Sequence, residues 1–401
     1  MISPPAATIA TAAAARAATT ATSTTAPGAT APAAATAPAA TPNAATPRGP
    51  SGIPLVIAHR GASGYRPEHT RAAYELAIEM GADAIEPDIV ATSDGVLVLR
   101  HENEISGTTD VAFISKFADR RTTKVIDGVE LTGWFTEDFT WAELSTLRAA
   151  ERLPKIRRGS ATFIGGGGIL RLRDLLDILD AAPRPMVLVA EIKHATYFAS
   201  LGLPLDELFA AEIADWATPQ NLIVESFEET VLTQIRERGV PGGLVYLLDK
   251  VGSAPDLVAT LGTDAPTYLD QLTDASLARL AGVVDGISVT KSLILRKDDA
   301  GESTETSDLV DRAHAVGLST WVWTLRAENQ FLSRHLKRGL AAGAYGEWMT
   351  EFRLILSSGV DGVFADQPDL ALRARDERAP GGRALGDRAL GDRAPGVVPD
   401  A

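Results

Sequence analysis

The chain has 401 residues, 45% of them apolar and 22% charged, with no cysteine and a formal net charge of −14. This composition can supply the core of one large or two ordinary domains, and the lack of cysteine excludes disulfides, thiolate nucleophiles and cysteine-ligated metals. The acidic balance argues against a nucleic-acid partner, and no uninterrupted apolar run approaches the roughly 18 residues of an integral membrane segment.

The first 52 residues are rich in Ala, Thr and Pro and hold almost no large apolar side chain. Such a segment cannot bury enough surface to offset its chain entropy, so residues 1–52 are predicted to be a disordered linker. They lack the basic start and apolar stretch of a signal peptide. The composition favours a secreted or cell-wall-associated protein, with a cytoplasmic protein as the alternative. Residues 379–401 contain a five-residue repeat, a period of neither helix nor strand, and are predicted to be a disordered tail.

Removal of both terminal segments is expected to leave the protein nearly unchanged. A chain without residues 1–50 and without the residues after 379 should keep its melting temperature and turnover, because neither segment has the apolar content to join a core. Calorimetry and an activity assay on the truncated chain check this, and a large fall in melting temperature would contradict it.

Between the two ends, short β-branched runs alternate with amphipathic helical stretches. Strands are predicted at residues 55–59, 84–90, 187–191, 222–226, 243–247, 286–290, 319–323 and 361–364. Helices are predicted at residues 70–80, 170–180, 205–216, 228–238, 274–280, 307–316 and 346–357. Eight strands alternating with helices predict an α/β fold, a (β/α)8 TIM barrel over residues 53–378. An open doubly wound sheet is the alternative.

Two segments fall outside this alternation. Residues 95–99 form a ninth strand-like run, which we interpret as a hairpin return beside the second strand. Residues 103–168 follow neither period and contain several glycines, so they are predicted to be an insertion after the second strand. We expect this insertion to cap the mouth of the barrel.

Charged residues end several of the predicted strands, where a parallel barrel carries its active site. Glu86 and Asp88 are two apart on one strand, so their side chains share a face, and Glu191 ends the next strand. Any one of them alone would more commonly be a helix cap or a salt-bridge partner. Together they are costly in a packed interior unless a cation or a proton neutralises them. The set therefore predicts a site for a hard divalent cation.

Imidazoles and fixed positive charges accompany these acids. His59 and His101 each end a strand-like run, and although a lone histidine could be a core residue, two beside a metal site can exchange protons near neutral pH. Arg60 and Lys193 add positive charge, and arginine can fork onto a phosphate. This combination suits a phosphoester better than a carbonyl substrate.

Two aromatic residues, Phe227 and Trp323, also stand at predicted strand ends. Aromatic side chains near a barrel mouth either pack against the core or line the substrate site. From the pattern alone both interpretations stay open.

Several stretches resemble the glycerophosphodiester phosphodiesterase family. The longest are HRGASGYRPEHT at 59–70, GADAIEPD at 81–88 and DGVLVLRH at 94–101, followed by EIK at 191–193, ESF at 225–227, WVWT at 321–324 and DGVFADQP at 361–368. The resemblance covers about residues 54–375. It implies a TIM barrel that hydrolyses glycerophosphodiesters, such as glycerophosphocholine, to sn-glycerol 3-phosphate and an alcohol.

The resemblance also implies roles for individual positions. It matches the metal ligands to Glu86, Asp88 and Glu191, the acid/base pair to His59 and His101, the phosphate contacts to Arg60 and Lys193, and a further active-site acid to Glu68. Phe227 and Trp323 lie within matching motifs and are taken with Glu68 as substrate-binding residues.

Further features resemble the bacterial periplasmic or secreted subgroup. These are His69 and the segment GWFTEDFT at 133–140 inside the insertion. The subgroup implies Ca²⁺ as the cofactor, with Mg²⁺ or another divalent ion as the alternative. Glu102 departs from the Asp that many relatives carry after the second histidine, which leaves the metal preference and the substrate fit open.

Two rival functions remain beside this one. The nearer is a phospholipase-D-like enzyme of the same fold that acts on lysolipids or sphingolipids, which a wider apolar mouth would favour. The other is a non-catalytic wall-binding module, against which the intact histidines and acids argue. The expected partner is a small-molecule glycerophosphodiester, and the sequence leaves the oligomeric state open.

Overall fold

The computed structural model of the protein describes residues 52–163 and 167–377. The predicted linker up to residue 51 and the predicted tail from residue 379 lie outside the described residues. Within them, no helix is long and apolar enough to cross a membrane.

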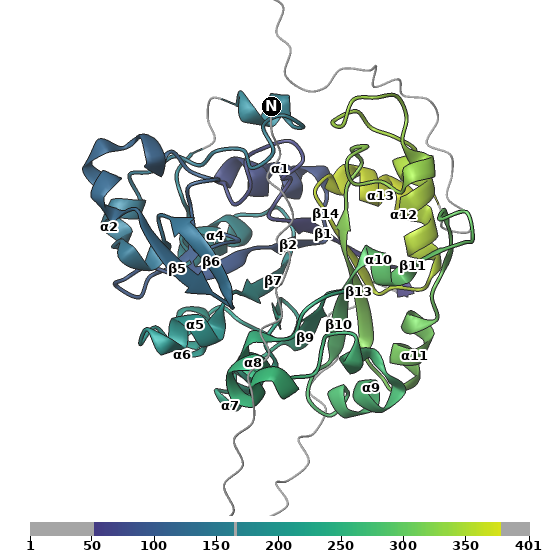
Figure 1. The fold of residues 1–401 in the computed structure, drawn as a ribbon. Coiled ribbons are helices and arrows are strands. Elements are labelled where there is room, and N and C mark those ends of the chain that lie inside the picture. Colours follow the sequence, from purple (N-terminus) through teal and green to yellow (C-terminus); the bar gives the residue numbers. More distant parts are fainter. Residues whose placement is uncertain (1–51, 164–166, 378–401) are drawn as a thin grey trace, which may run out of the picture. The chain divides into compact units, whose positions relative to one another are not determined.

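A closed barrel of eight parallel strands forms the centre of the described part (Figure 1). Its strands are β1 (Leu55–His59), β2 (Ala84–Glu86), β7 (Val187–Ile192), β8 (Leu222–Ser226), β9 (Gly243–Leu248), β10 (Gly286–Thr290), β13 (Ser319–Leu325) and β14 (Gly362–Ala365). The barrel closes because β1 pairs with both β2 and β14, and β2 pairs with β7. The predicted (β/α)8 fold is confirmed, and the open-sheet alternative is wrong.

The second predicted strand, at 84–90, is divided at Pro87. β2 ends at Glu86, and β3 (Asp88–Ala91) continues after the proline, which has no N–H to donate to a neighbouring strand. β3 pairs with β7 so that Asp88 lies opposite Glu191. On its other edge β3 pairs antiparallel with β4 (Leu97–Leu99), the predicted hairpin return.

Amphipathic helices surround the barrel. The helices that follow the predicted stretches are α1 (Arg71–Met80), α4 (Leu172–Asp180), α6 (Leu205–Ile213), α7 (Glu229–Glu237), α9 (Asp274–Leu280), α11 (Leu309–Ala315) and α12 (Trp348–Ser357). The sequence analysis did not name α5 (Ala195–Ser200), α8 (Pro255–Leu261), α10 (Lys291–Ile294), α13 (Pro368–Asp376) or the hairpin of β11 (Leu295–Lys297) and β12 (Ser303–Thr306). In α1, the Thr70 side chain accepts a hydrogen bond from the Ala73 N–H and caps the first turn.

Alternate strand residues separate two apolar layers. One set, including Leu55, Ile57 and Trp321, fills the barrel interior. Residues of the opposite face, such as Val56 and Ala58, belong to the larger core between strands and helices. This period of two also fixes which residues at the strand ends face the barrel mouth.

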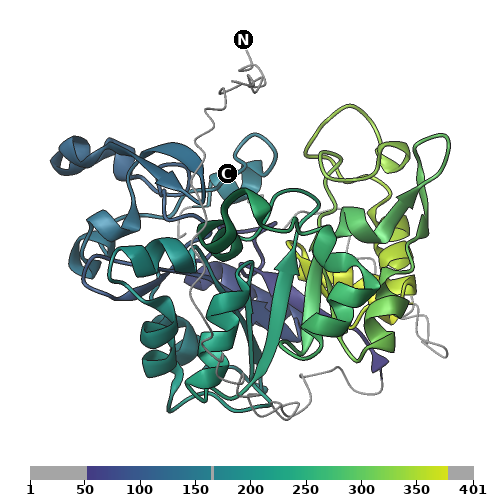
Figure 2. The same cartoon turned by 60° about the horizontal axis from the view of Figure 1, so that its bottom comes forward.

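The segment from residue 103 to 168 lies between β4 and α4. Its regular elements include the antiparallel hairpin of β5 (Thr122–Ile126) and β6 (Val129–Gly133) and the short helices α2 (Trp141–Leu144) and α3 (Arg158–Ala161). Within it, Phe117 and Phe139 pack edge to face, with ring centroids 5.0 Å apart, and they belong to the same large core as Val56 and Ala58. In Figure 2 this segment, drawn in blue, and the loop after β13 rise on the same side of the barrel.

Candidate active site

The inward-facing rows of three barrel strands each end in a glutamate. Following Ala84, Val189 and Ile223, which pack in the barrel interior, the next inward positions are Glu86, Glu191 and Glu225. Two-residue periodicity therefore aims these three carboxylates at the carboxyl end of the barrel.

A cavity of about 400 Å³ opens at this end of the barrel. The predicted site residues that line it are His59, Arg60, Glu86, His101, Glu191, Phe227 and Trp323, and Glu225, Arg152, Lys291, Arg326 and Phe331 are among the others. Asp88, Glu68 and Lys193 contact these lining residues from behind. The structure thus brings all ten predicted site residues into one region.

Glu86, Glu191 and Glu225 form the tightest acidic cluster. Each offers a carboxylate oxygen, and these oxygens all lie within 4.8 Å of one another. Burial and Asp88 raise the pKa of Glu86 well above its usual range, and burial and Glu191 do the same for Glu225. Burial also raises the pKa of Glu191 to about 8, although Lys193 opposes this shift. The cluster favours either a proton or a cation among the carboxylates.

Glu225 was not named as a ligand in the sequence analysis, although it stands in the ESF motif. Its spacing from the inward-facing Ile223 was the signal that could have found it. Oε2 of Glu225 and Oε1 of Glu86 are buried and accept no hydrogen bond within the described part of the chain. Buried oxygens of this kind are usually satisfied by a donor or an ion.

Asp88 has a different environment from that of the three glutamates. Its Oδ2 lies 3.0 Å from Nε of Arg60 and 2.9 Å from Nε2 of His69, and its Oδ1 lies 3.7 Å from Nζ of Lys193. Burial works against ionisation, but Arg60, with other cationic neighbours, lowers the pKa of Asp88 well below its usual range. Asp88 is thus an anion, and its Oδ1 accepts no hydrogen bond from a described residue.

The raised carboxyl pKa values predict a pH-dependent stability. A glutamate whose pKa is about 8 when folded and about 4.3 when unfolded stabilises the fold fully below the lower value and loses this contribution as the pH rises towards 8. Chelator-treated protein should therefore lose melting temperature between pH 6.5 and 8. Saturating calcium should flatten the slope, because a cation replaces the proton. An equal slope with and without calcium would contradict this account.

His59 is held by an acid from the other end of the chain. Its Nδ1 lies 2.6 Å from Oδ1 of Asp366, which follows β14, and its backbone carbonyl accepts a hydrogen bond from the Ser63 hydroxyl. Burial, with Arg60 nearby, lowers the pKa of His59 to about 4, although Asp366 opposes this shift. The imidazole is therefore neutral at pH 7, and with Nδ1 engaged, Nε2 is the nitrogen available to a substrate.

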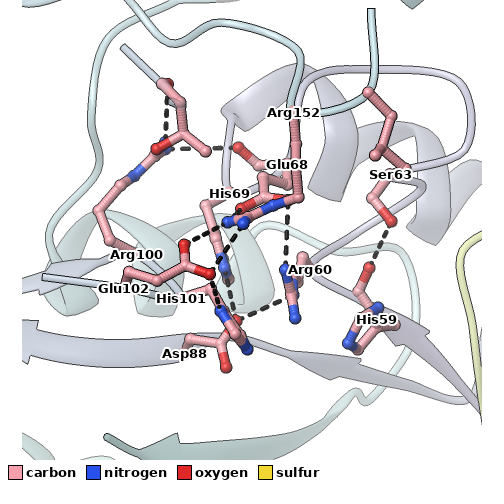
Figure 3. Close-up of polar contacts among 12 residues, drawn as sticks. His59, Arg60, Ser63, Glu68, His69, Asp88, Arg100, His101, Glu102 and Arg152 are labelled. Atoms are coloured by element: carbon pink, nitrogen blue, oxygen red, sulfur yellow. Dashed lines mark hydrogen bonds and ion pairs between the residues drawn. The ribbon is translucent and has the colours of Figure 1, made fainter. Parts of the chain in front are cut away.

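His101 has the same arrangement, but its carboxylate partner, Glu102, is the next residue in the chain. Its Nδ1 lies 2.5 Å from Oε1 of Glu102, and its side chain is 30% exposed (Figure 3). Partial burial and the positive charges of Arg60 and Lys193 lower its pKa. Glu102 thus reaches the imidazole and orients it.

The turn after β1 places Arg60 between the acids. Arg60 has a φ of 60° and Gly61 a φ of 81°, both in the left-handed region. A Cβ on Gly61 would lie 2.7 Å from the Ala73 backbone, so only glycine fits there. The Arg60 N–H donates to Oε2 of Glu86 at 2.7 Å, and its guanidinium lies between Asp88 and Glu68.

Lys193 contacts the wall of the cavity, and two aromatic residues form part of it. Nζ of Lys193 donates to Oε1 of Glu191 at 2.7 Å and lies 5.4 Å from the ring centroid of Phe227. Phe227 packs edge to face against Trp323, with centroids 5.8 Å apart. Both aromatic residues line the cavity, so they form part of its surface as well as its packing.

Taken together, the site combines an acidic cluster, two buried cations and two oriented imidazoles. A carboxylate cluster can hold a divalent cation, and cations beside it can neutralise an anionic phosphoester. Two neutral imidazoles with open Nε2 atoms can relay protons. The arrangement is suited to hydrolysis of a phosphodiester.

Comparison with known proteins gives the same assignment. Residues 59–370 match the model of the glycerophosphoryl diester phosphodiesterase family. The Arabidopsis thaliana glycerophosphodiester phosphodiesterase GDPD6 is 33% identical over 329 residues, which cover 78% of this chain and 83% of the plant protein.

Solved structures share the fold. One from Silicibacter pomeroyi, assigned to the same family, has a TM-score of 0.57 at 22% identity and covers 82% of this chain and 95% of its own. An Oleispira antarctica phosphodiesterase, solved with the product sn-glycerol-3-phosphate, has a TM-score of 0.53 at 19% identity, with coverages of 81% and 98%.

Proposed function

Because this chain belongs to the glycerophosphoryl diester phosphodiesterase family, we propose that it hydrolyses small glycerophosphodiesters to sn-glycerol 3-phosphate and an alcohol, with a bound divalent cation and with His59 and His101 as the acid/base pair. The observation that carries the proposal is the meeting of the acidic cluster, Arg60 and both imidazoles at one cavity. The product assignment is supported by the Oleispira antarctica complex, whose ligand is sn-glycerol-3-phosphate.

The residues present fit a divalent cation. Glu86, Asp88 and Glu225 each keep one buried carboxylate oxygen that accepts no hydrogen bond within residues 52–163 and 167–377, and Glu191 lies between them. We propose that Glu86, Asp88 and Glu191 hold the ion, with Glu225 beside them. An all-oxygen, carboxylate-rich set suits calcium, which accepts irregular geometry, better than magnesium, which demands near-ideal octahedral geometry. The bound ion would neutralise phosphate charge and polarise the P–O bonds.

The chain's own residues supply the remaining chemistry. Arg60 and Lys193 bind phosphate oxygens and keep the substrate against the carboxylate cluster. An imidazole with its hydrogen on Nδ1 accepts the proton of the nucleophile at Nε2. The other imidazole, once it has taken up a proton at Nε2 from the solvent, donates that proton to the departing alcohol oxygen. The nucleophile is either water or the C2 hydroxyl of the glycerol, in which case water later opens a cyclic phosphate. By either route the P–O bond to the alcohol breaks.

The composition of the cavity favours a soluble headgroup over a lipid. Its wall carries the cations Arg60, Arg152, Lys291 and Arg326, which suit an anionic phosphodiester, and its volume is about 400 Å³. Phe227, Trp323 and Phe331 add aromatic surface to its wall, which suits the alcohol portion. We propose that the protein is secreted or attached to the cell wall, the location that the composition of its N-terminal segment favours.

A substrate panel tests the proposal. The full chain, with calcium, is assayed on glycerophosphocholine, glycerophosphoethanolamine and micellar lysophosphatidylcholine. We expect the soluble diesters to be hydrolysed with a kcat/KM at least 10-fold above that for the micelles. A preference for micelles would assign the phospholipase-D-like function instead, and inactivity on all three with every divalent ion would favour the wall-binding module.

A further inference from the structure

The segment between α2 and α3 reaches from the insertion into the active site. It carries Arg152 and Arg157, five residues apart, and neither was named in the sequence analysis. Arg157 is buried and Arg152 is partly buried. Each of these two arginines binds a carboxylate that contacts one of the two histidines.

Arg157 binds the acid behind His59. Its Nη2 donates to Oδ2 of Asp366 at 2.5 Å, and Oδ1 of the same carboxylate lies 2.6 Å from Nδ1 of His59. Its Nε donates to Oε1 of Glu328 at 2.7 Å, and its Nη1 donates to the Ser63 carbonyl at 3.0 Å. The guanidinium therefore joins the loop after β13 to the loops that follow β14 and β1.

Arg152 binds the acid behind His101. Its Nη1 and Nη2 donate to the two oxygens of Glu102 at 2.8 and 2.6 Å, and Oε1 of Glu102 lies 2.5 Å from Nδ1 of His101. Its Nε and Nη2 also donate to Glu68 at 2.8 and 2.6 Å. Glu68 in turn pairs with Arg60 (Figure 3). The Arg152 guanidinium thus holds both Glu102, the partner of His101, and Glu68, the partner of Arg60.

The contact of Arg157 with Asp366 and that of Arg152 with Glu102 have the same chemical consequence. A neutral imidazole carries one N–H, and a carboxylate opposite Nδ1 keeps that hydrogen on Nδ1 and leaves Nε2 as the acceptor. The carboxylate does this only while it is ionised and fixed. A carboxylate that is removed from water, as Asp366 is fully and Glu102 in part, is kept ionised and fixed by a paired, hydrogen-bonded cation. The planar fork of arginine can bind two carboxylates at once, which the point charge of lysine does poorly.

We propose that Arg152 and Arg157 are positioning residues, through which the insertion fixes Glu102 and Asp366 and thereby the tautomer and orientation of His101 and His59. The insertion is then a working part of the catalytic machinery and not only a cover for the barrel. This inference rests on the proposed acid/base role of the two histidines.

Four variants of the full chain test it: Arg152→Lys, Arg152→Met, Arg157→Lys and Arg157→Met. Arg158→Lys is the matched control, since Arg158 is exposed and its side chain touches neither carboxylate. The first measurement is the long-range ¹H–¹⁵N spectrum of the histidine rings at pH 7. Spectra of His59→Ala and His101→Ala assign the two signals. The second measurement is kcat and KM on glycerophosphocholine with calcium.

We expect the Nδ1–H tautomer of His59 in the wild type and a mixture in the Arg157 variants, with the same change for His101 in the Arg152 variants. kcat should fall by about 10- to 100-fold, as for other residues that orient a catalytic group, while KM changes by less than about 3-fold. The lysine variants should keep the wild-type melting temperature to within a few degrees and still show both losses. Arg158→Lys should match the wild type throughout.

Unchanged tautomers in the lysine variants would overturn the inference, whatever their activity. A loss of kcat that is fully explained by a smaller fraction of folded protein would also overturn the inference. The spectra do not depend on turnover, so a failure of the proposed function is recognised separately. A wild type inactive on glycerophosphocholine would refute that function, and the tautomers would still decide whether the arginines set the histidines.

Discussion

Replacement of either His59 or His101 by alanine is expected to lower kcat on glycerophosphocholine by about 10²- to 10⁴-fold, the range for a positioned proton-transfer group. Both imidazoles lie at the cavity, and each turns Nδ1 to a carboxylate and leaves Nε2 for the substrate. The fold should survive, because both lie at the mouth and outside the apolar interior of the barrel. Steady-state kinetics, with circular dichroism as the check on folding, measure the effect.

His314→Ala is the matched control, because His314 lies on α11 and pairs with Asp361, away from the cavity. It should keep wild-type kcat. The losses of the two active-site variants should not add in the double variant, because residues that act as a unit are not additive. Nearly full activity of His101→Ala beside an inactive His59→Ala would contradict the paired mechanism. Glu102 or a metal-activated water would then be the leading proton carrier.

Removal of divalent ions is expected to abolish turnover and to destabilise the protein. The carboxylate oxygens of Glu86, Glu191 and Glu225 lie within 4.8 Å of one another. Without a cation, these carboxylates either repel one another or must bind protons. Calcium at 100 times its Kd should add about 2.7 kcal/mol to the free energy of unfolding, because it binds only the folded state. Turnover after chelation and after each ion is restored, followed by calorimetry, measures both effects.

Glu86→Gln should reproduce part of this loss by weakening calcium binding, which isothermal titration measures directly. Glu75→Gln, on the exposed side of α1, is the control and should bind calcium as the wild type does. Full activity in excess chelator would contradict metal dependence. Unchanged calcium affinity of Glu86→Gln would contradict the placement of the ion.

Local patterns predicted most of the barrel. Each strand of the barrel overlaps a predicted β-branched run. The residues that face the barrel interior and those that face the helices are both mostly apolar, so each strand stands out as a short apolar run. The division of the second strand at Pro87 was predictable from the missing N–H of proline alone. The helix Pro368–Asp376 was not named, because it follows the DGVFADQP motif and has only a few buried residues.

The candidate site was predictable where strand periodicity places side chains. The inward row of β1 leads from Leu55 and Ile57 to His59, and the same rule also reaches Glu225. Glu102 directly follows its partner His101, but the partner of His59 and the arginines behind the two carboxylates were not predictable in this way. Asp366 is 307 residues from His59, and Arg152 is 84 residues from Glu68, inside a segment without strand or helix period. Such contacts depend on the closure of the barrel and on the path of the insertion.

The most direct test of the central claim follows the oxygen of water through the reaction. The full chain, with calcium, is incubated with glycerophosphocholine in H₂¹⁸O, and the products are identified by ³¹P NMR and mass spectrometry. The account predicts unlabelled choline and sn-glycerol 3-phosphate with one ¹⁸O on phosphorus, because the P–O bond to choline breaks by either route. Phosphocholine and glycerol as products, or ¹⁸O in the released choline, would contradict it.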